Sequence, residues 1–445
     1  MHYHPLTEND KQEMLREIGV SSFDELLRGI PAALRNPSMQ LPEALSELEV
    51  QALLRELGSQ NQTVKGFLSF LGGGSYEHFI PAAVSEITGR GEFYTAYTPY
   101  QPEASQGTLQ TIYEYQSLMT ELTGLDVSNG SHYDGSTSMA EAGLMACRHT
   151  DRTVILVARS VHPHYRRVLK TYVEGTPYSV EEFGFAADGS FDRNGLSERL
   201  GPEVAGVILQ TPNFFGRVEN LEGISEKVHE NGSLLILSGH PLSMAVFKTP
   251  GEWGADAAVG EGQPLGIPLG FGGPYLGYFV TTRALMRRIP GRLVGMTQDS
   301  EDRRTFCLTL QAREQHIRRE RAASNICTNQ ALCALAACVH MTLLGKAGIR
   351  DTAELNLDRA WYLREKISKL KGYSVDLSAP VFNEFIVTPE KPFAEIEKKL
   401  MENKIFPGID LGQFYPEMKN QFLVCATETK TREELDRFVE ALSQC

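Results

Sequence analysis

The sequence predicts an α/β protein with a mostly parallel sheet and a smaller α/β domain at its C-terminus. Short β-type runs alternate with helical segments between residues 153 and 239, which is typical of a parallel sheet with helices on both faces. After residue 329 a long apolar helix pattern precedes a shorter series of strands and helices. The chain has 445 residues, 42% of them hydrophobic, which is enough for a large core and two domains.

Residues 1–64 predict an N-terminal arm of short helices. Thr7 precedes "ENDKQEML" and Ser22 precedes "FDELLRGIP". In both places an N-cap residue is followed by acidic residues in the first turn, which suits the helix dipole. The arm has too few apolar residues to fold alone.

Residues 65–328 predict the large domain. The segment "TLQTIYEYQSLMTELTGL" reads as a helix that ends at Gly124, and four later segments read as strands: "TVILVA", "YSVEEF", "GVILQT" and "LLILSG". Ligands of such sheets collect where strands end and helices begin.

Residues 329–445 predict a connecting helix and a small α/β domain. The helix "NLDRAWYLREKISKL" is followed by the strand "NEFIVT", the helix "PFAEIEKKLMENK" and the strand "FLVCATE". Thr431 and Glu434 form a capping box at the start of the last helix. This general layout is that of pyridoxal phosphate (PLP) enzymes of the aspartate aminotransferase fold, or fold type I.

Charge and composition limit the partners. The net charge is −13 and no basic stripe is present, so nucleic acid and anionic membranes are poor candidates. The N-terminus has no signal pattern, and no fully apolar run reaches the roughly 18 residues of a membrane span. The seven cysteines, with Cys327, Cys333 and Cys338 in an apolar helical pattern, indicate buried thiols in the cytoplasm, and no spacing indicates a metal site.

Two loops have both a functional and an ordinary interpretation. "YDGSTSMAEAG" (133–143) has the composition of a phosphate-binding helix start, but Ser and Thr are also favoured N-caps. "FYTAYTPYQPE" (93–103) offers tyrosines for a cofactor ring or an interface, or for anchoring the loop on the core.

Two further segments are open in the same way. His162 and His164 lie past a strand, where a histidine can stack on a cofactor, and no third metal ligand is placed by spacing. The charge run Arg313–Arg321 indicates a solvated face, and the small polar residues after it indicate a packed junction or a subunit contact.

The glycine-rich stretch 254–277 lacks the lysine that its position predicts. Enzymes of this fold hold PLP through a Schiff base with a lysine that follows a late strand, yet no lysine occurs between Lys248 and Lys346. They also place an Asp at the end of an earlier strand, where this chain has Ser238, Gly239 and His240. We therefore expect a closely packed segment that binds no PLP covalently.

Three long segments closely resemble the glycine decarboxylase P-protein family of the glycine cleavage system: residues 94–142, "GEWGADAAVGEGQPLGIPLGFGGPYLGYF" and "RRERAASNICTNQAL". The resemblance covers nearly the whole chain and is to the alpha subunit, equivalent to the N-terminal half of the fused form. It implies a partner beta subunit that binds PLP covalently, in a dimer of heterodimers with one active site per heterodimer. It also implies glycine decarboxylation, transfer of the aminomethyl group to the lipoyl arm of H-protein, and work beside the T- and L-proteins.

The resemblance also implies roles for single residues. Tyr97 and Tyr100 are the expected catalytic contributors, in a loop that reaches the beta subunit's cofactor pocket. The other expected interface or site residues are Thr98, Gln101, Ser131, Asp134, Ser136, Thr137, Ser324 and Asn325. The resemblance assigns no role to His240. Two alternatives remain open: an independent PLP enzyme with a displaced lysine, and a non-catalytic degenerate subunit that only stabilises its partner.

Overall fold

The computed structural model describes residues 5–35, 37–326 and 328–445, and it divides into two compact units, residues 1–63 and 64–445. Cys327 therefore lies outside the described residues. The sequence boundary between residues 328 and 329 stays a prediction.

The first unit consists of short helices, as predicted. They are α1 (Glu8–Ile18), α2 (Phe23–Leu26), a 3-10 turn (Ala32–Leu34) and α3 (Glu47–Ser59). Thr7 caps α1 in a capping box with Asp10, and Ser46 caps α3 in the same way with Glu49. Ser22 precedes α2, but its side chain makes no cap bond. None of the described helix residues of this unit is buried.

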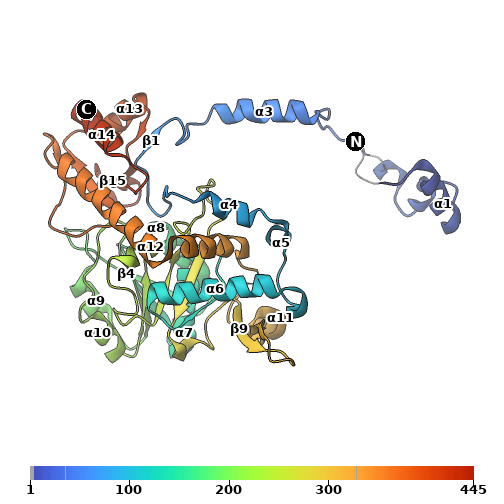
Figure 1. Cartoon of the computed structure of the whole chain (residues 1–445), viewed down its shortest axis with the longest axis horizontal. Coiled ribbons are helices and arrows are strands. Elements are labelled where there is room, and N and C mark those ends of the chain that lie inside the picture. Colours follow the sequence, from blue (N-terminus) through green and yellow to red (C-terminus); the bar gives the residue numbers. More distant parts are fainter. Residues whose placement is uncertain (1–4, 36, 327) are drawn as a thin grey trace. The chain divides into compact units, whose positions relative to one another are not determined.

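Within the described part of the second unit, seven strands form one sheet in the order β2-β8-β7-β6-β5-β3-β4. Figure 1 labels its strand β4 and several of the helices of this unit. Its strands are β2 (Val127–Ser128), β3 (Val154–Ala158), β4 (Ser179–Phe183), β5 (Val204–Gln210), β6 (Leu234–Ser238), β7 (Ala257–Glu261) and β8 (Gly277–Thr281). Strands β3 to β7 pair in parallel, and only the pairs with β8 are antiparallel. The mostly parallel sheet is thus confirmed.

Two apolar clusters lie on the two faces of this sheet. Val259 and Phe279 pack in one cluster with residues of α7 (Gly135–Thr150), whereas Ala258 and Tyr278 pack in the other with residues of α6 (Gln106–Thr123). Alternate strand residues point to opposite faces, so helices cover both. The other helices of this region are α4 (Ala82–Thr88), α5 (Gly91–Tyr94), α8 (Pro163–Val173), α9 (Arg193–Arg199) and α10 (Ile224–Glu230).

The seven-stranded sheet is followed by a β-hairpin, which the sequence pattern did not predict. Strands β9 (Leu293–Gln298) and β10 (Arg304–Thr309) pair antiparallel, and Val294 and Phe306 pack on Leu109 and Ile112 of α6. The short helix α11 (Gln315–Arg318) comes after it. The expected solvated face holds for most of the charge run, but Arg313 donates from its guanidinium to the Ile289 and Gly291 carbonyls.

The C-terminal region contains the expected smaller α/β layer. Its elements are α12 (Ala331–Ile367), β11 (Tyr373–Ser374), β12 (Glu384–Pro389), α13 (Phe393–Glu402), β13 (Ile405–Phe406), β14 (Ile409–Asp410), β15 (Phe422–Cys425) and α14 (Arg432–Ser443). The sheet order is β11-β12-β15-β14, and β13 pairs in parallel with β1 (Leu68–Ser69). The predicted capping box of Thr431 and Glu434 is confirmed.

Two helices were predicted in this segment, and the structure has two. They are joined within α12 at Gly345, whose φ of 60° and ψ of −175° are non-helical. Helix α12 is also the one described helix long and apolar enough to span a membrane by length and composition. Its Ala334, Ala337 and Met341 are buried in the apolar cluster shared with α6, which indicates a core helix.

Candidate active site

The tyrosine-rich loop lies at the surface between α5 and a 3-10 turn (Pro102–Ala104). The exposed fractions of Tyr97 and Tyr100 are 79% and 46%, whereas Pro99 between them is buried. Thr98 is half-buried, and its carbonyl accepts the Tyr100 amide at 2.8 Å. Gln101 is exposed. The buried proline fixes the loop while the two tyrosines face outward.

Tyr100 rests on a buried arginine. A terminal nitrogen of Arg292 donates to the Tyr100 hydroxyl at 3.1 Å, and the guanidinium carbon lies 5.4 Å from the ring centroid. The ring of His316 meets Tyr100 edge-on at 5.8 Å. Glu314 lies near both side chains, with its carboxylate 4.0 Å from Arg292 and 3.7 Å from His316.

Asn329 joins this cluster to the predicted residue Ser131. Its side-chain oxygen accepts a bond from Arg292 at 3.3 Å, and its amide nitrogen donates to the Ser131 hydroxyl at 3.0 Å. The backbone amide of Gln330 also donates to Ser131 at 3.1 Å. The structure thus brings the tyrosine loop, Ser131 and the "SNICTNQ" segment together.

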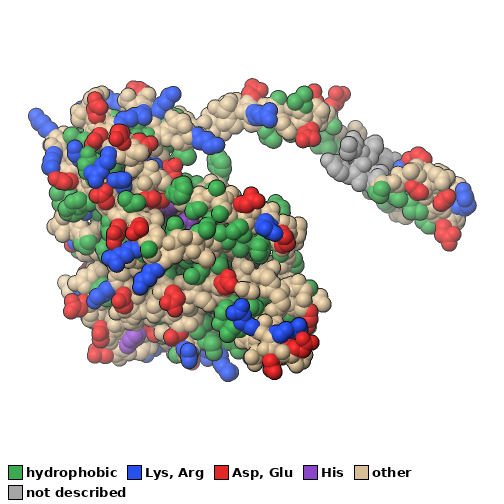
Figure 2. Space-filling view, in the orientation of Figure 1, with side chains coloured by type: hydrophobic (Ala, Val, Ile, Leu, Met, Phe, Trp, Pro, Cys, Tyr) green, Lys and Arg blue, Asp and Glu red, His purple; other side chains and the backbone are tan. Residues whose placement is uncertain are grey.

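Two hollows flank the cluster. One of about 270 Å³ is lined by the tyrosine loop, α6 and the start of α12, including Tyr97, Thr98 and Asn329. Another of about 440 Å³ is lined by His316, Asn325 and neighbouring residues. Figure 2 shows apolar side chains at the surface around α4 and α5, where Tyr94 and Phe79 are also exposed. Open hollows beside exposed aromatic rings are suited to contact with another chain.

The other predicted residues serve different local purposes. The Asp134 carboxylate caps α7 by accepting the Thr137 amide at 2.7 Å and the Ser136 hydroxyl at 2.8 Å. Ser324 donates to the carboxylate of Glu141 on α7 at 2.6 Å. Burial raises the pKa of Glu141, and the Ser324 bond and Arg148 oppose that shift. These side chains tie segments of this chain to one another.

A carboxyl group lies at the helix start whose composition suggested a phosphate site. Glu261, the last residue of β7, accepts the backbone amides of Gln263 and Leu276 at 2.9 Å and that of Gly135, at the start of α7, at 3.0 Å. A Cβ on Gly135 would lie 2.7 Å from the Glu261 nitrogen, so the helix start is packed directly on the strand end. Burial raises the pKa of Glu261 to about 8, and the three backbone donors oppose the shift.

The strand ends beside Glu261 leave little room. The residues Ser238, Gly239, His240, Gln210, Pro212 and His162 are among those that line a cavity of about 30 Å³. His162 bonds from one ring nitrogen to the Gly73 carbonyl at 2.7 Å and stacks on Tyr165. Burial lowers the pKa of His162 to about 4. The side chains at these strand ends are therefore closely packed against one another.

His240 is held among aromatic rings. Its Nε2 lies 3.4 Å from that of His78, and its ring centroid lies 4.7 Å from that of Tyr76. Burial, followed by the nearness of His78, lowers the pKa of His240 well below its ordinary value. A neutral histidine is present where an acid would hold a pyridine nitrogen.

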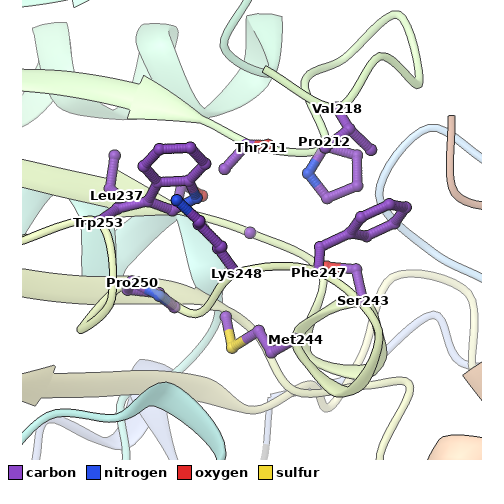
Figure 3. A pocket seen from close by; sticks show the side chains of 12 residues that line it. Thr211, Pro212, Val218, Leu237, Ser243, Met244, Phe247, Lys248, Pro250 and Trp253 are labelled. Atoms are coloured by element: carbon purple, nitrogen blue, oxygen red, sulfur yellow. The ribbon is translucent and has the colours of Figure 1, made fainter. Parts of the chain in front are cut away.

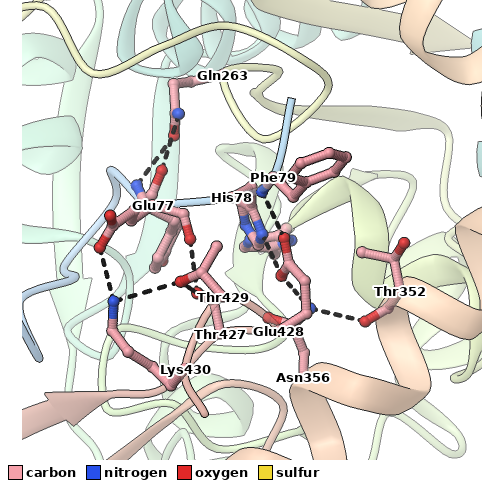
Figure 4. A network of polar contacts seen from close by, with 12 residues as sticks. Glu77, His78, Phe79, Gln263, Thr352, Asn356, Thr427, Glu428, Thr429 and Lys430 are labelled. Atoms are coloured by element: carbon pink, nitrogen blue, oxygen red, sulfur yellow. Dashed lines mark hydrogen bonds and ion pairs between the residues drawn. The ribbon is translucent and has the colours of Figure 1, made fainter. Parts of the chain in front are cut away.

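A polar network joins the segment of Glu77 and His78 to the C-terminal region (Figure 4). The Glu428 carboxylate lies 2.8 Å from His78 and accepts the Asn356 amide at 2.8 Å. Lys430 donates to the Glu77 carboxylate at 2.7 Å. The buried amine of Lys430 is therefore engaged by this network.

Lys248 is exposed, with its amine 4.4 Å from the Trp253 ring centroid. It lines a mostly apolar hollow of about 230 Å³ (Figure 3), which shares Pro212, Ser238 and Gly239 with the strand-end cavity. Lys346 lies beside the kink of α12. No lysine occurs in the sequence between β7 and α12, where the Schiff-base lysine of this fold was expected.

The tip of the glycine-rich stretch departs from the expectation of close packing. Residues 261–267 are buried, but Phe271 is fully exposed, with φ 53°. Sequence reasoning also missed Arg292, Glu314, His316 and Glu261. A lone Arg in "IPGRLVG" and a charged residue at the end of the apolar strand "GADAAVGE" were the available signals.

Comparisons with known proteins agree on one family. The family model described as "Glycine cleavage system P-protein" matches residues 1–442. A protein of Desulfitobacterium hafniense named "Probable glycine dehydrogenase (decarboxylating) subunit 1" is 47% identical over 445 residues, with all of both chains covered. A protein of a Geobacillus species with the same name is 49% identical over 444 residues, covering 100% of this chain and 99% of the other.

Solved structures give the same picture. A crystal structure of glycine decarboxylase (P-protein) of the glycine cleavage system, in inhibitor-bound form, matches with a TM-score of 0.92 and 41% identity over the full length of both chains. A sphingosine-1-phosphate lyase of Burkholderia pseudomallei matches with a TM-score of 0.67 at 13% identity, over 93% of this chain and 94% of the other. At that identity the likeness shows the fold alone, and it confirms the PLP-dependent fold type I architecture.

Proposed function

The chain belongs to the glycine cleavage system P-protein family, and from this premise we propose that it is the alpha subunit of glycine dehydrogenase (decarboxylating). In this proposal the beta subunit binds PLP through its own lysine. The two chains together decarboxylate glycine, and the aminomethyl group passes to the lipoyl arm of H-protein. The enzyme acts in the cytoplasm beside the T- and L-proteins.

One observation carries the division of roles between the subunits. The Glu261 carboxyl occupies the amides at the start of α7, and the strand-end cavity measures about 30 Å³. This close packing, with the absence of a lysine between β7 and α12, supports a PLP site on the second chain. PLP bound there would provide an electron sink for decarboxylation.

The tyrosine loop is the proposed contribution of this chain to the shared site. Tyr97 and Tyr100 project outward from a loop anchored at Pro99, with hydroxyls able to donate or accept hydrogen bonds. Thr98 and Gln101 belong to the same loop. Thr98 lines one of the two hollows, and Asn325 lines the other. At the interface these side chains would orient glycine and exclude water around the partner's cofactor. Ser131 supports them through Asn329.

The test compares the isolated chain with the assembled pair. The purified chain should show no visible PLP absorbance and no glycine–bicarbonate exchange, and mixing with the beta subunit should produce both. Borohydride trapping followed by peptide mapping should label only the beta subunit. A trapped peptide containing Lys248 or Lys346 would overturn the proposal.

Phenylalanine substitutions separate this function from a purely stabilising role. Tyr97→Phe and Tyr100→Phe should assemble normally and lose turnover, because only the hydroxyls are removed. Tyr178→Phe, in the loop before β4, is the matched control and should keep full turnover. Wild-type turnover in both site variants would favour a subunit that only stabilises its partner.

A further inference from the structure

Arg292 lies where three segments of the candidate site meet. Its side chain is only 4% exposed, and its backbone carbonyl accepts the Gly130 amide at 2.8 Å. Removing an arginine from water is costly unless its donors are used, so a buried guanidinium implies a defined set of partners. The residue follows the bend at Gly291 and directly precedes β9.

The contacts of Arg292 fix the direction of its guanidinium. One terminal nitrogen donates to the Tyr100 hydroxyl and the other to Asn329, while Glu314 lies 4.0 Å from Nε. The planar, forked shape allows these groups to be held at once, which a lysine ammonium does not reproduce. Tyr100 is thus held both at its ring face and at its oxygen.

This geometry decides how the Tyr100 hydroxyl can act. A guanidinium has donors only, so the phenol oxygen must be the acceptor in the Arg292 bond. The phenol proton then remains available to a different partner. Because 46% of Tyr100 is exposed, that partner can belong to another chain or to its ligand.

We propose that Arg292 is a positioning residue that presents the Tyr100 hydroxyl as a hydrogen-bond donor to the active site shared with the beta subunit. The inference rests on the proposed function, and it adds that the Tyr100 hydroxyl donates its hydrogen bond to the shared site. Arg292 itself touches neither glycine nor cofactor, and its influence passes through Tyr100. Asn329 and Glu314 keep the guanidinium in place.

The first test uses the isolated chain and needs no cofactor. The amides of Tyr100, Ala104 and Ser105 are bonded within the loop and the turn after it, so their hydrogen exchange reports the order of this segment. Arg292→Gln should speed their exchange about tenfold or more, and Arg292→Lys should fall between, since a misoriented donor gives partial support. The control is Arg304→Gln, an exposed arginine of β10 that lies over the Phe306 ring. Unchanged exchange in Arg292→Gln would overturn the proposal.

The second test is a double-mutant cycle in the assembled enzyme, read as kcat/KM for glycine. Arg292→Gln should lower it about ten- to a hundredfold when Tyr100 is present, because a small misplacement of a positioned group has effects of this size. In the Tyr100→Phe background the same change should cost less than about twofold, because the positioned hydroxyl is gone. Equal effects in both backgrounds would show that Arg292 acts independently of Tyr100 and would overturn the proposal.

The two readouts separate the inference from the function on which it rests. If Tyr100→Phe is fully active, the proposed role of Tyr100 fails, whereas exchange in the isolated chain still decides whether Arg292 orders the loop. If exchange is unchanged and Tyr100→Phe is inactive, the shared active site stands and Arg292 is not its positioning residue.

Discussion

Removing the Glu261 carboxyl should destabilise the sheet–helix junction strongly. In Glu261→Ala three buried backbone amides, those of Gly135, Gln263 and Leu276, lose their acceptor. A buried donor without a partner costs about 1–3 kcal/mol, and water entering the new space can satisfy one of the three, which leaves a loss of about 2–6 kcal/mol. Glu261→Gln keeps one oxygen for Gln263 and Leu276 but turns an NH₂ group toward the Gly135 amide, so about 1–3 kcal/mol should be lost.

The assay is equilibrium urea unfolding of the isolated chain, followed by circular dichroism. Glu181→Ala, an exposed glutamate of β4, is the control and should change the unfolding free energy by less than about 0.5 kcal/mol. Formate should restore part of the stability of Glu261→Ala and none in the control, because a small carboxylate can occupy the vacated position. If Glu261→Ala and Glu181→Ala unfold together, Glu261 does not fill a position that the fold needs.

Further outcomes follow from other buried groups. Burial raises the pKa of Glu219 and of Glu384 to about 7, so folding favours their protonated forms. The unfolding free energy should therefore fall as pH rises from about 4.5 to about 7. Glu219→Gln should make that fall smaller in a pH series of urea titrations. Asp134→Ala should cost about 1–2 kcal/mol of unfolding free energy through loss of the α7 cap, and Asp134→Asn should retain most of it. Gly216→Ala should lower the yield of folded protein, because Gly216 has φ 81° and a Cβ there would overlap the Glu384 carbonyl; Gly175→Ala, also at positive φ but with open space around it, is the matched control.

The alternating strands and helices were predictable because the spacing of apolar residues and the helix caps depend on residues that are close in sequence. The parallel strands β3 to β6 and the caps at Thr7 and Thr431 followed from residues adjacent in sequence. The hairpin of β9 and β10 was not predictable in this way. Its core contacts come from α6, almost 200 residues earlier, so its own sequence carries only part of the pattern.

The sequence predicted some residues of the candidate site, but it did not predict the contacts between them. The sequence placed Tyr97 and Tyr100 in one loop and marked the missing lysine, since both are local facts. Arg292 and Asn329 link that loop to Ser131 across 192 and 198 positions, and spacing says nothing about such contacts. Arg292 and Glu261 each had a local signal, a charged residue in an apolar segment, but neither signal identified the partners of the side chain.

The contacts of Glu261 and the tyrosine loop are parts of one connected structure. Glu261 holds the start of α7 through Gly135, and the segment just before α7 bonds to the Arg292 carbonyl through the Gly130 amide. Arg292 in turn holds Tyr100. Because Glu261 is part of the chain, it holds the start of α7 without any ligand. A base that is already ordered before a partner binds lowers the ordering cost of assembly.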